Sequence, residues 1–130
     1  RMGQLYAEIM QTTPDLVGIT IRDLGEGSVW HAGLDAPVPA AVLSLEVRRG
    51  RPPEQRARLA SALVDACTEA LGLNPAHFAV EFTQHAGDES YRKLFVGGVL
   101  YGALGRDWTP DEASKPLFET MKDEARRKAL

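Results

Sequence analysis

The densest group of charged side chains in the sequence lies around Gly50, which has arginines on both sides. Arg48 and Arg51 are three positions apart across this glycine, so their guanidinium groups can converge on one anion. The planar fork of donors on each guanidinium suits a carboxylate. The residue types and their spacing therefore predict a site for a small carboxylate. The alternative is that these arginines are solvated or paired with Glu46 or Glu54.

Regular elements on both sides of the arginines are needed to hold them in place. Apolar residues recur with helical spacing over Pro53–Leu71, and Gly72 suits the end of a helix. Alternation of apolar and polar residues predicts strands at Leu43–Val47 and Phe78–Thr83. A strand, a helix-length crossover and a second strand predict one βαβ unit with parallel strands over Ala41–Thr83. Its arginines then lie where α/β units bind anions, beyond a strand's carboxyl end and at a helix start.

The beginning of the chain repeats the second half of this unit. Adding 61 to the position pairs Met2 with Leu63 and Pro14 with Pro75, and it places Val17, Ile19 and Ile21 on Phe78, Val80 and Phe82. Residues 1–22 are thus predicted to be the end of an earlier βαβ unit, with a strand at residues 17–21. Position 1 corresponds to position 62, whereas the later unit opens at position 41, so a counterpart of 21 residues (62 minus 41) is missing. We expect a truncated chain, and a circular permutation is the alternative.

The whole chain is predicted to be one domain. Its parts are residues 1–35, which end the first unit, residues 36–86, which hold the second unit, and residues 87–130, which form a C-terminal tail. Within the tail, the apolar stretch Leu94–Leu104 predicts an irregular strand or a loop, and a helix is expected from Pro116.

Composition excludes several classes of function. The 130 residues carry a net charge of −3, so a general affinity for nucleic acid is not expected. His31, His77 and His85 are too far apart in sequence for a metal-binding motif, and the single Cys67 cannot form an internal disulfide. Apolar runs fall short of the ~20 residues of a membrane-spanning helix, and no signal peptide pattern opens the chain. A cytoplasmic protein with no metal and no membrane partner is predicted.

Two related βαβ units containing Glu46–Arg56 (EVRRGRPPEQR) resemble the tautomerase superfamily. The Arg-x-Gly-Arg spacing and Trp108–Met121 (WTPDEASKPLFETM) resemble more narrowly its cis-3-chloroacrylic acid dehalogenase branch. This resemblance implies an α+β subunit of tandem βαβ units, with a four-stranded mixed sheet, two helices on one face and a C-terminal helical tail. It also implies a homotrimer that needs no cofactor.

The resemblance further implies roles for individual residues. Arg48 and Arg51 would hold the substrate carboxylate, and Glu89 would activate water in a dehalogenase-like reaction. Tyr6 falls near the place of a histidine in the dehalogenase branch and could donate a hydrogen bond. The family's catalytic group is an amino-terminal proline on the strand that has no counterpart here. Arg1 cannot replace it, because a primary amine at the end of a helix is neither placed nor tuned for that role.

Three functions are compatible with these observations. The first is a tautomerase-like isomerase that acts by general acid–base catalysis on a small 2-oxo, enol, halogenated or unsaturated acid. The second is a non-catalytic binding or assembly subunit that keeps the fold but lacks the proline. The third is a ferredoxin-like α+β binding domain, which would explain neither the arginine turn nor the repeat.

Overall fold

The structure is a computed structural model that describes residues 1–12, 14, 17–86, 91–93, 100–102, 107–109 and 116, the side chains of 91–93 and 100–102 excepted. Two compact units make up the chain: Arg1–Leu45 with Ala57–Glu81, and Glu46–Arg56 with Phe82–Leu130. The prediction of a single domain with three consecutive parts stays a prediction. The arginine turn belongs to the second unit.

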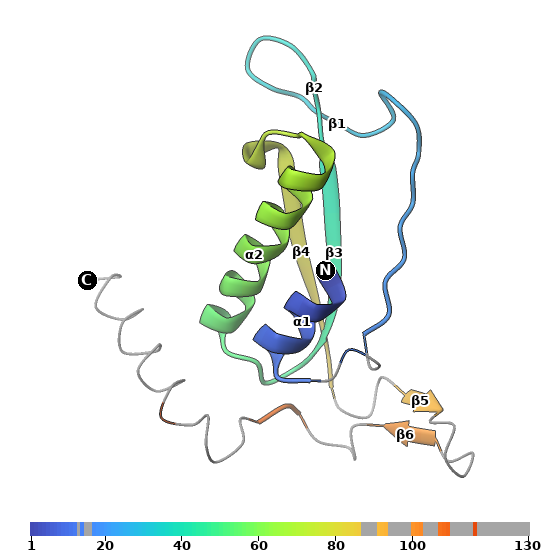
Figure 1. Ribbon diagram of the computed structural model, residues 1–130, viewed down its shortest axis with the longest axis vertical. Helices are drawn as coiled ribbons and strands as arrows, with labels where there is room; N and C mark the ends of the chain where they lie inside the picture. The colour runs from blue at the N-terminus through green and yellow to red at the C-terminus, as the bar shows by residue number, and fades with distance from the viewer. Residues whose placement is uncertain are drawn as a thin grey trace. The chain divides into compact units, whose positions relative to one another are not determined.

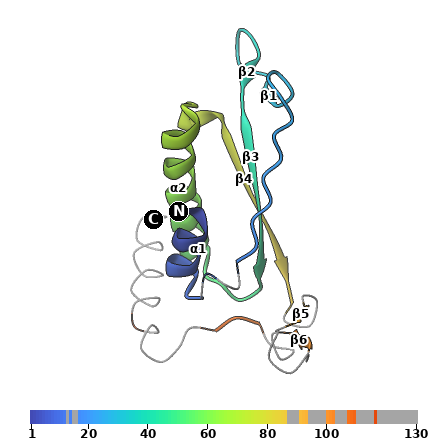
Figure 2. The same cartoon turned by 45° about the vertical axis from the view of Figure 1, so that its right-hand side comes forward.

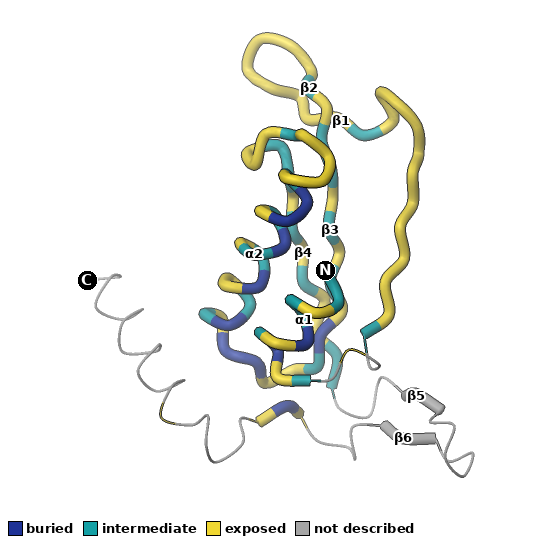
Figure 3. Tube along the Cα trace, viewed as in Figure 1, coloured by how far each residue is buried: buried dark blue, intermediate teal, exposed yellow. Residues whose placement is uncertain are grey.

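The long helix α2 (Pro53–Leu71) has the bounds that the sequence predicts. Pro53 opens it because a first-turn residue needs no N–H donor, and its fixed φ already suits a helix. Gly72 ends it with a φ of +69°, and its N–H donates to the Thr68 carbonyl at 2.9 Å. One stripe of α2 is buried, as the dark blue stretches of Figure 3 show; it consists of Leu59, Leu63, Ala66 and Cys67. This stripe supplies four of the eight buried apolar residues in the described part of the chain.

Two eight-residue strands flank α2 in the chain, β3 (Ala41–Arg48) and β4 (Phe78–His85). They pair with each other, and their arrows point the same way in Figure 2. The pair is therefore parallel, and together with α2 it forms the predicted βαβ unit. A short 3₁₀ helix, η2 (Pro75–His77), leads into β4, and the side chain of Asn74 caps it by accepting from the Ala76 N–H at 2.9 Å.

The first helix, α1 (Met2–Met10), packs beside α2, with both helices on the same side of β3 and β4 (Figures 1 and 2). Ala7 and Met10 are its buried residues. The Arg1 guanidinium pairs with the Glu69 carboxylate of α2 at 2.8 Å. Both side chains are more than two-thirds exposed, so this pair adds little stability. Gln11 ends α1 in the left-handed conformation with a φ of 53°.

Residues 17–25, which include the strand predicted at 17–21, are not a strand. They carry no regular structure, and Figure 1 draws them as a long blue coil without a strand arrow. Ile19 is 51% exposed and Ile21 is 83% exposed. The apolar pattern at 17–21 is not sufficient for a strand, because a strand also needs a hydrogen-bonded neighbour. Within the described residues β3 pairs with β4, and no ladder partner lies along 17–25.

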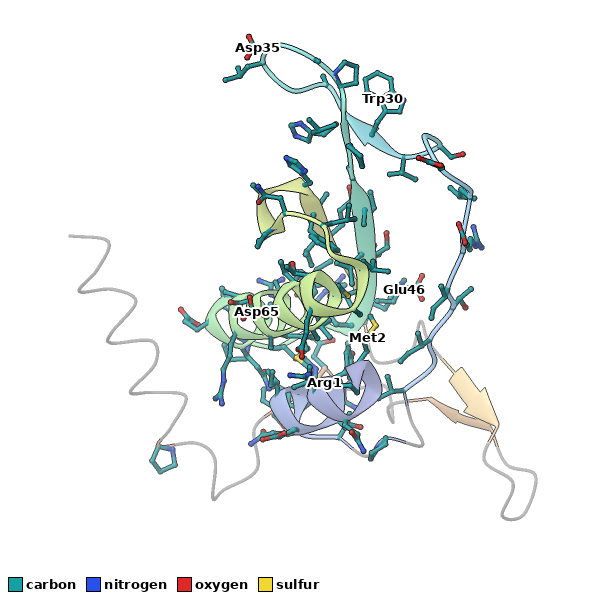
Figure 4. All side chains as sticks on the ribbon, turned by 45° about the horizontal axis from the view of Figure 1, so that its top comes forward. Arg1, Met2, Trp30, Asp35, Glu46 and Asp65 are labelled. Carbon is teal, nitrogen blue, oxygen red and sulfur yellow. The ribbon has the colours of Figure 1, made fainter. Side chains whose placement is uncertain are left out.

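A small hairpin precedes β3. Its strands are β1 (Trp30–His31) and β2 (Val38–Pro39), which pair antiparallel with Trp30 opposite Pro39. Figure 4 shows Trp30 and Asp35 on this hairpin, and the Trp30 side chain is 60% exposed. Trp30 is therefore not a core residue of this subunit.

The tail contributes two further strands, β5 (Tyr91–Lys93) and β6 (Leu100–Gly102), which pair antiparallel with Tyr91 opposite Gly102. Pro116 is helical, and the rest of the helix predicted from it lies outside the described residues. Helices and paired strands around a βαβ unit confirm the α+β class. Of the four-stranded sheet, the described residues show β3 paired with β4.

Candidate functional site

The candidate site is a turn that joins β3 to α2 in the second compact unit. Val47, near the end of β3, is only 2% exposed and fixes the strand there. Gly50 has a φ of +106°, a conformation that residues with a Cβ rarely adopt, so the chain can reverse sharply between Arg48 and Arg51. The Arg49 N–H donates to the His85 carbonyl at 2.7 Å, which ties the turn to the end of β4.

Trp108 closes over this turn from a distant part of the sequence. Its N–H donates to the Arg49 carbonyl at 2.6 Å. The Arg51 guanidinium carbon lies 4.7 Å from the centroid of the Trp108 ring, within the range of a cation–π interaction. Arg51 is 9% exposed and Trp108 is 6% exposed, so the contact is largely shielded from water. Trp108 is therefore a core residue, and it also covers a predicted binding residue.

The start of α2 offers an anion few backbone donors. Pro52 and Pro53 have no N–H, and the N–H groups of Gln55 and Arg56 donate to the Pro52 carbonyl at 3.1 and 3.2 Å. The helix dipole still favours negative charge here. Strong donors to an anion must nevertheless come mainly from the arginine side chains, and not from the backbone as in phosphate-binding loops.

Buried polar atoms gather around the turn. The Nε atoms of Arg48 and Arg51 are both shielded from solvent. Among the described residues, no hydrogen-bond partner reaches the buried Oε2 of Glu54 or the buried Nε2 of His85. Leaving such atoms unsatisfied costs about 1–3 kcal/mol each, so native proteins rarely bury them without a reason such as a ligand. This cluster marks the turn as the best candidate for a binding site.

The predicted site residues are distributed unequally. Arg48 and Arg51 lie in one unit at the two ends of the Gly50 turn, and their joint role in binding a carboxylate stays a prediction. Tyr6 is half-buried on α1 in the other unit, and its role stays a prediction. Glu89 lies outside the described residues.

Two neighbours of the arginines were missed by sequence reasoning. Trp108 is far from the turn in sequence, and nothing in its surroundings there marks it as a partner of Arg51. His85 lies at the end of β4, the edge of the strand pair where the arginines also lie, and this position is the signal that could have identified it.

The described part of the chain contains neither a cluster of metal-ligating side chains nor a membrane-length apolar helix. No group of three histidine, cysteine, aspartate or glutamate side chains there could hold a metal ion. No helix there is long and apolar enough to span a membrane. The pKa of the Cys67 thiol is raised by burial on α2, which keeps the thiol protonated and chemically quiet.

A parallel βαβ unit with a buried arginine at the strand-to-helix turn defines an α+β protein with a candidate anion site. No protein-family model matches the sequence, and no curated protein matches it significantly. Solved structures do match the fold. The crystal structure of N1, a member of the cis-3-chloroacrylic acid dehalogenase family, is 21% identical with a TM-score of 0.61, and the match covers 94% of this chain and 83% of that one.

The second match is the crystal structure of Pt0534 inactivated by 2-oxo-3-pentynoate. It is 22% identical with a TM-score of 0.65, and the match covers 82% of this chain and 83% of that chain. The chain therefore has the fold of these proteins. The α+β fold expected from the sequence is thus the fold of a cis-3-chloroacrylic acid dehalogenase family member, whereas membership of the tautomerase superfamily stays a prediction.

Proposed function

We propose that the chain is a tautomerase-like isomerase that acts on a small carboxylate-bearing 2-oxo or enol acid, or on a halogenated or unsaturated acid. The observation that carries the proposal is the Arg51 guanidinium, buried under Trp108 where β3 ends and α2 begins. A shielded guanidinium binds a carboxylate more strongly than an exposed one, because water competes less and the local dielectric constant is low.

In this mechanism Arg48 and Arg51 hold the substrate carboxylate and fix the position of the neighbouring carbons. Ketonisation of an enol acid moves the proton of the enol oxygen to solvent or base and adds one proton at C3, so atoms and charge balance. By resemblance the base is an amino-terminal proline, which would precede Arg1 in the intact protein. Tyr6 would donate a hydrogen bond, and Glu89 would activate water in a hydration or dehalogenation variant.

The likeness to N1 and Pt0534 supports this class of chemistry, since the name of the first refers to a dehalogenase family and the second reacts with a 2-oxo acid analogue. We further propose a cytoplasmic homotrimer that uses no cofactor. The alternative is a non-catalytic binding or assembly subunit.

The test combines the intact mass and amino-terminal sequence of the natural protein with a phenylenolpyruvate ketonisation assay. We expect an amino-terminal proline and measurable ketonisation. Arg51→Ala should lower kcat/KM by about 100-fold or more, because it removes the buried partner of the carboxylate. Arg58→Ala is the matched control, since Arg58 is exposed on α2, and its kcat/KM should stay within about twofold.

Each of the other outcomes decides between the alternatives. A protein that binds phenylpyruvate in an Arg51-dependent way but lacks both the proline and ketonisation supports the binding subunit. A protein that neither ketonises phenylenolpyruvate nor binds phenylpyruvate overturns the carboxylate site. Equal losses in Arg51→Ala and Arg58→Ala would show that Arg51 has no special role.

A further inference from the structure

The ladder between β3 and β4 places His85 beside Arg48. In a parallel pair, the carbonyl of a residue on one strand accepts from an N–H on the other strand. That N–H belongs to the residue immediately after the one that lies opposite. Here the Arg49 N–H donates to the His85 carbonyl, which makes Arg48 and His85 neighbours at the two strand ends. Adjacent strands are about 4.8 Å apart, so the two side chains start close together.

Both side chains also lie on the same face of the strand pair. Successive side chains alternate between faces, and Val47 is buried, so Arg48 lies on the opposite face of β3 from Val47. Ladder neighbours share a face, which puts His85 there as well. Along β4 the same alternation puts half-buried Phe82 and exposed Thr83 on opposite faces. His85 is two residues after Thr83 and therefore lies on the face of Thr83.

His85 is less exposed than the other residues on its face of β4. It is half-buried, and its Nε2 is shielded from solvent without a hydrogen-bond partner among the described residues. An imidazole nitrogen buried beside an arginine needs an acceptor or a donor that the described chain does not provide. A bound ligand oxygen would provide it.

We propose that His85 is a further ligand-binding residue of the arginine site, and that its Nε2 hydrogen bonds to an oxygen on the carbon next to the substrate carboxylate. This inference rests on the proposed function and deepens it. Neutral imidazole can donate to a ketone oxygen in one tautomer and accept from an enol hydroxyl in the other. The site therefore selects 2-oxo, enol or 2-hydroxy acids over acids that carry no oxygen at C2.

The experiment compares two ligands that differ only in that oxygen, phenylpyruvate and 3-phenylpropanoate, by calorimetry with the full-length protein. Wild type should bind phenylpyruvate about 10-fold more tightly. His85→Phe should abolish that preference and leave the Kd of 3-phenylpropanoate within about twofold. His85→Gln keeps a side-chain donor and acceptor, so it should retain part of the preference.

His77→Phe is the matched control, because His77 is also half-buried but precedes the opposite end of β4. It should leave both affinities unchanged. If His85→Phe does not fold, the same question is answered in wild type by NMR of ¹⁵N-labelled histidine. Phenylpyruvate should shift the His85 Nε2 resonance, whereas 3-phenylpropanoate should leave it in place.

The outcomes separate this inference from the proposed function. If wild type binds both acids equally and Arg51→Ala weakens both, the carboxylate site stands and the role of His85 is wrong. Equal weakening of both acids by His85→Phe would assign His85 a structural role and overturn the inference. If wild type binds neither acid, the proposed function fails and this inference fails with it.

Discussion

The contact between Arg51 and Trp108 combines packing with electrostatics at a single pair of residues. The indole ring covers the guanidinium carbon at 4.7 Å, and both side chains are at least nine-tenths buried. A desolvated cation–π pair contributes about 2 kcal/mol, in addition to the apolar area that the ring buries. Trp108 therefore both stabilises the fold and holds Arg51 in position.

Truncation of Trp108 should be costly. We expect Trp108→Ala to lower the free energy of unfolding by about 3–5 kcal/mol, because it leaves a cavity beside a buried cation. Trp108→Phe, which keeps a ring, should lose less. Chemical denaturation measures both values. Trp30→Ala is the control, since Trp30 is 60% exposed, and its effect should stay within about 0.5 kcal/mol in a monomer. Similar losses at the two tryptophans would contradict the role of Trp108.

Cys67 should be an unreactive thiol in the native protein. Burial raises its pKa above the unfolded value, so the thiolate forms only at higher pH in the folded state. The contribution of this thiol to the free energy of unfolding is fully present below the pKa of Cys67 in the unfolded chain. It is lost as pH rises through the pKa of Cys67 in the folded protein. We expect the pH profile of iodoacetamide alkylation to be shifted upward in native protein relative to urea-unfolded protein. Coinciding profiles would show that the thiol is not shielded.

At the scale of elements, the connection between β3 and α2 depends on one glycine. Gly50 has a φ of +106°, and a Cβ at this position would collide with the backbone carbonyl oxygen of Trp108. The turn and the Trp108 segment can approach because no side chain separates them. The backbone bond from Trp108 to Arg49 depends on the same close approach.

Substitution of this glycine should loosen the turn. We expect Gly50→Ala to lower the free energy of unfolding by about 1–3 kcal/mol and to weaken the binding of phenylpyruvate, because backbone strain and the clash displace Trp108. Gly72 has a positive φ but open space around it, so Gly72→Ala should be destabilised only by backbone strain. Gly18→Ala has neither, and should be neutral. Denaturation curves of the three variants measure these free energies of unfolding. Equal values for Gly50→Ala and Gly18→Ala would contradict the role of Gly50.

At the scale of the molecule, exposed apolar side chains concentrate between positions 19 and 42. The large ones are Ile19, Ile21, Leu24, Trp30, Leu34 and Val42, each more than half exposed. We expect another chain to cover part of this segment, because large apolar side chains are rarely left exposed in such number. The proposed homotrimer would cover it with further copies of the same chain.

Light scattering after size-exclusion chromatography should therefore report a trimer. Ile21→Lys should shift the mass toward a monomer, because a charge placed in an apolar interface is not solvated. Leu71→Lys is the matched control, since Leu71 is 63% exposed at the end of α2, outside this segment, and the trimer should survive. A monomeric wild type would contradict the proposed assembly.

Local patterns were sufficient for the central βαβ unit and for the two arginines of the candidate site. The bounds of α2 and the strands around it follow from residue periodicity and from Pro53 and Gly72, which act within a few residues. The arginines were predictable because their type and spacing are themselves local. The strand expected at residues 17–21 was not found, since a strand is defined by its ladder partner and not by its own alternation.

The sequence by itself determined that this protein is an α+β chain with a βαβ unit, a repeat and a pair of arginines at a strand-to-helix turn. Only the tertiary structure decided that Trp108 covers Arg51 and that His85 stands beside Arg48. These contacts join residues that are far apart in the chain. They depend on parallel strand register and on packing around Gly50, which no local pattern of residues encodes.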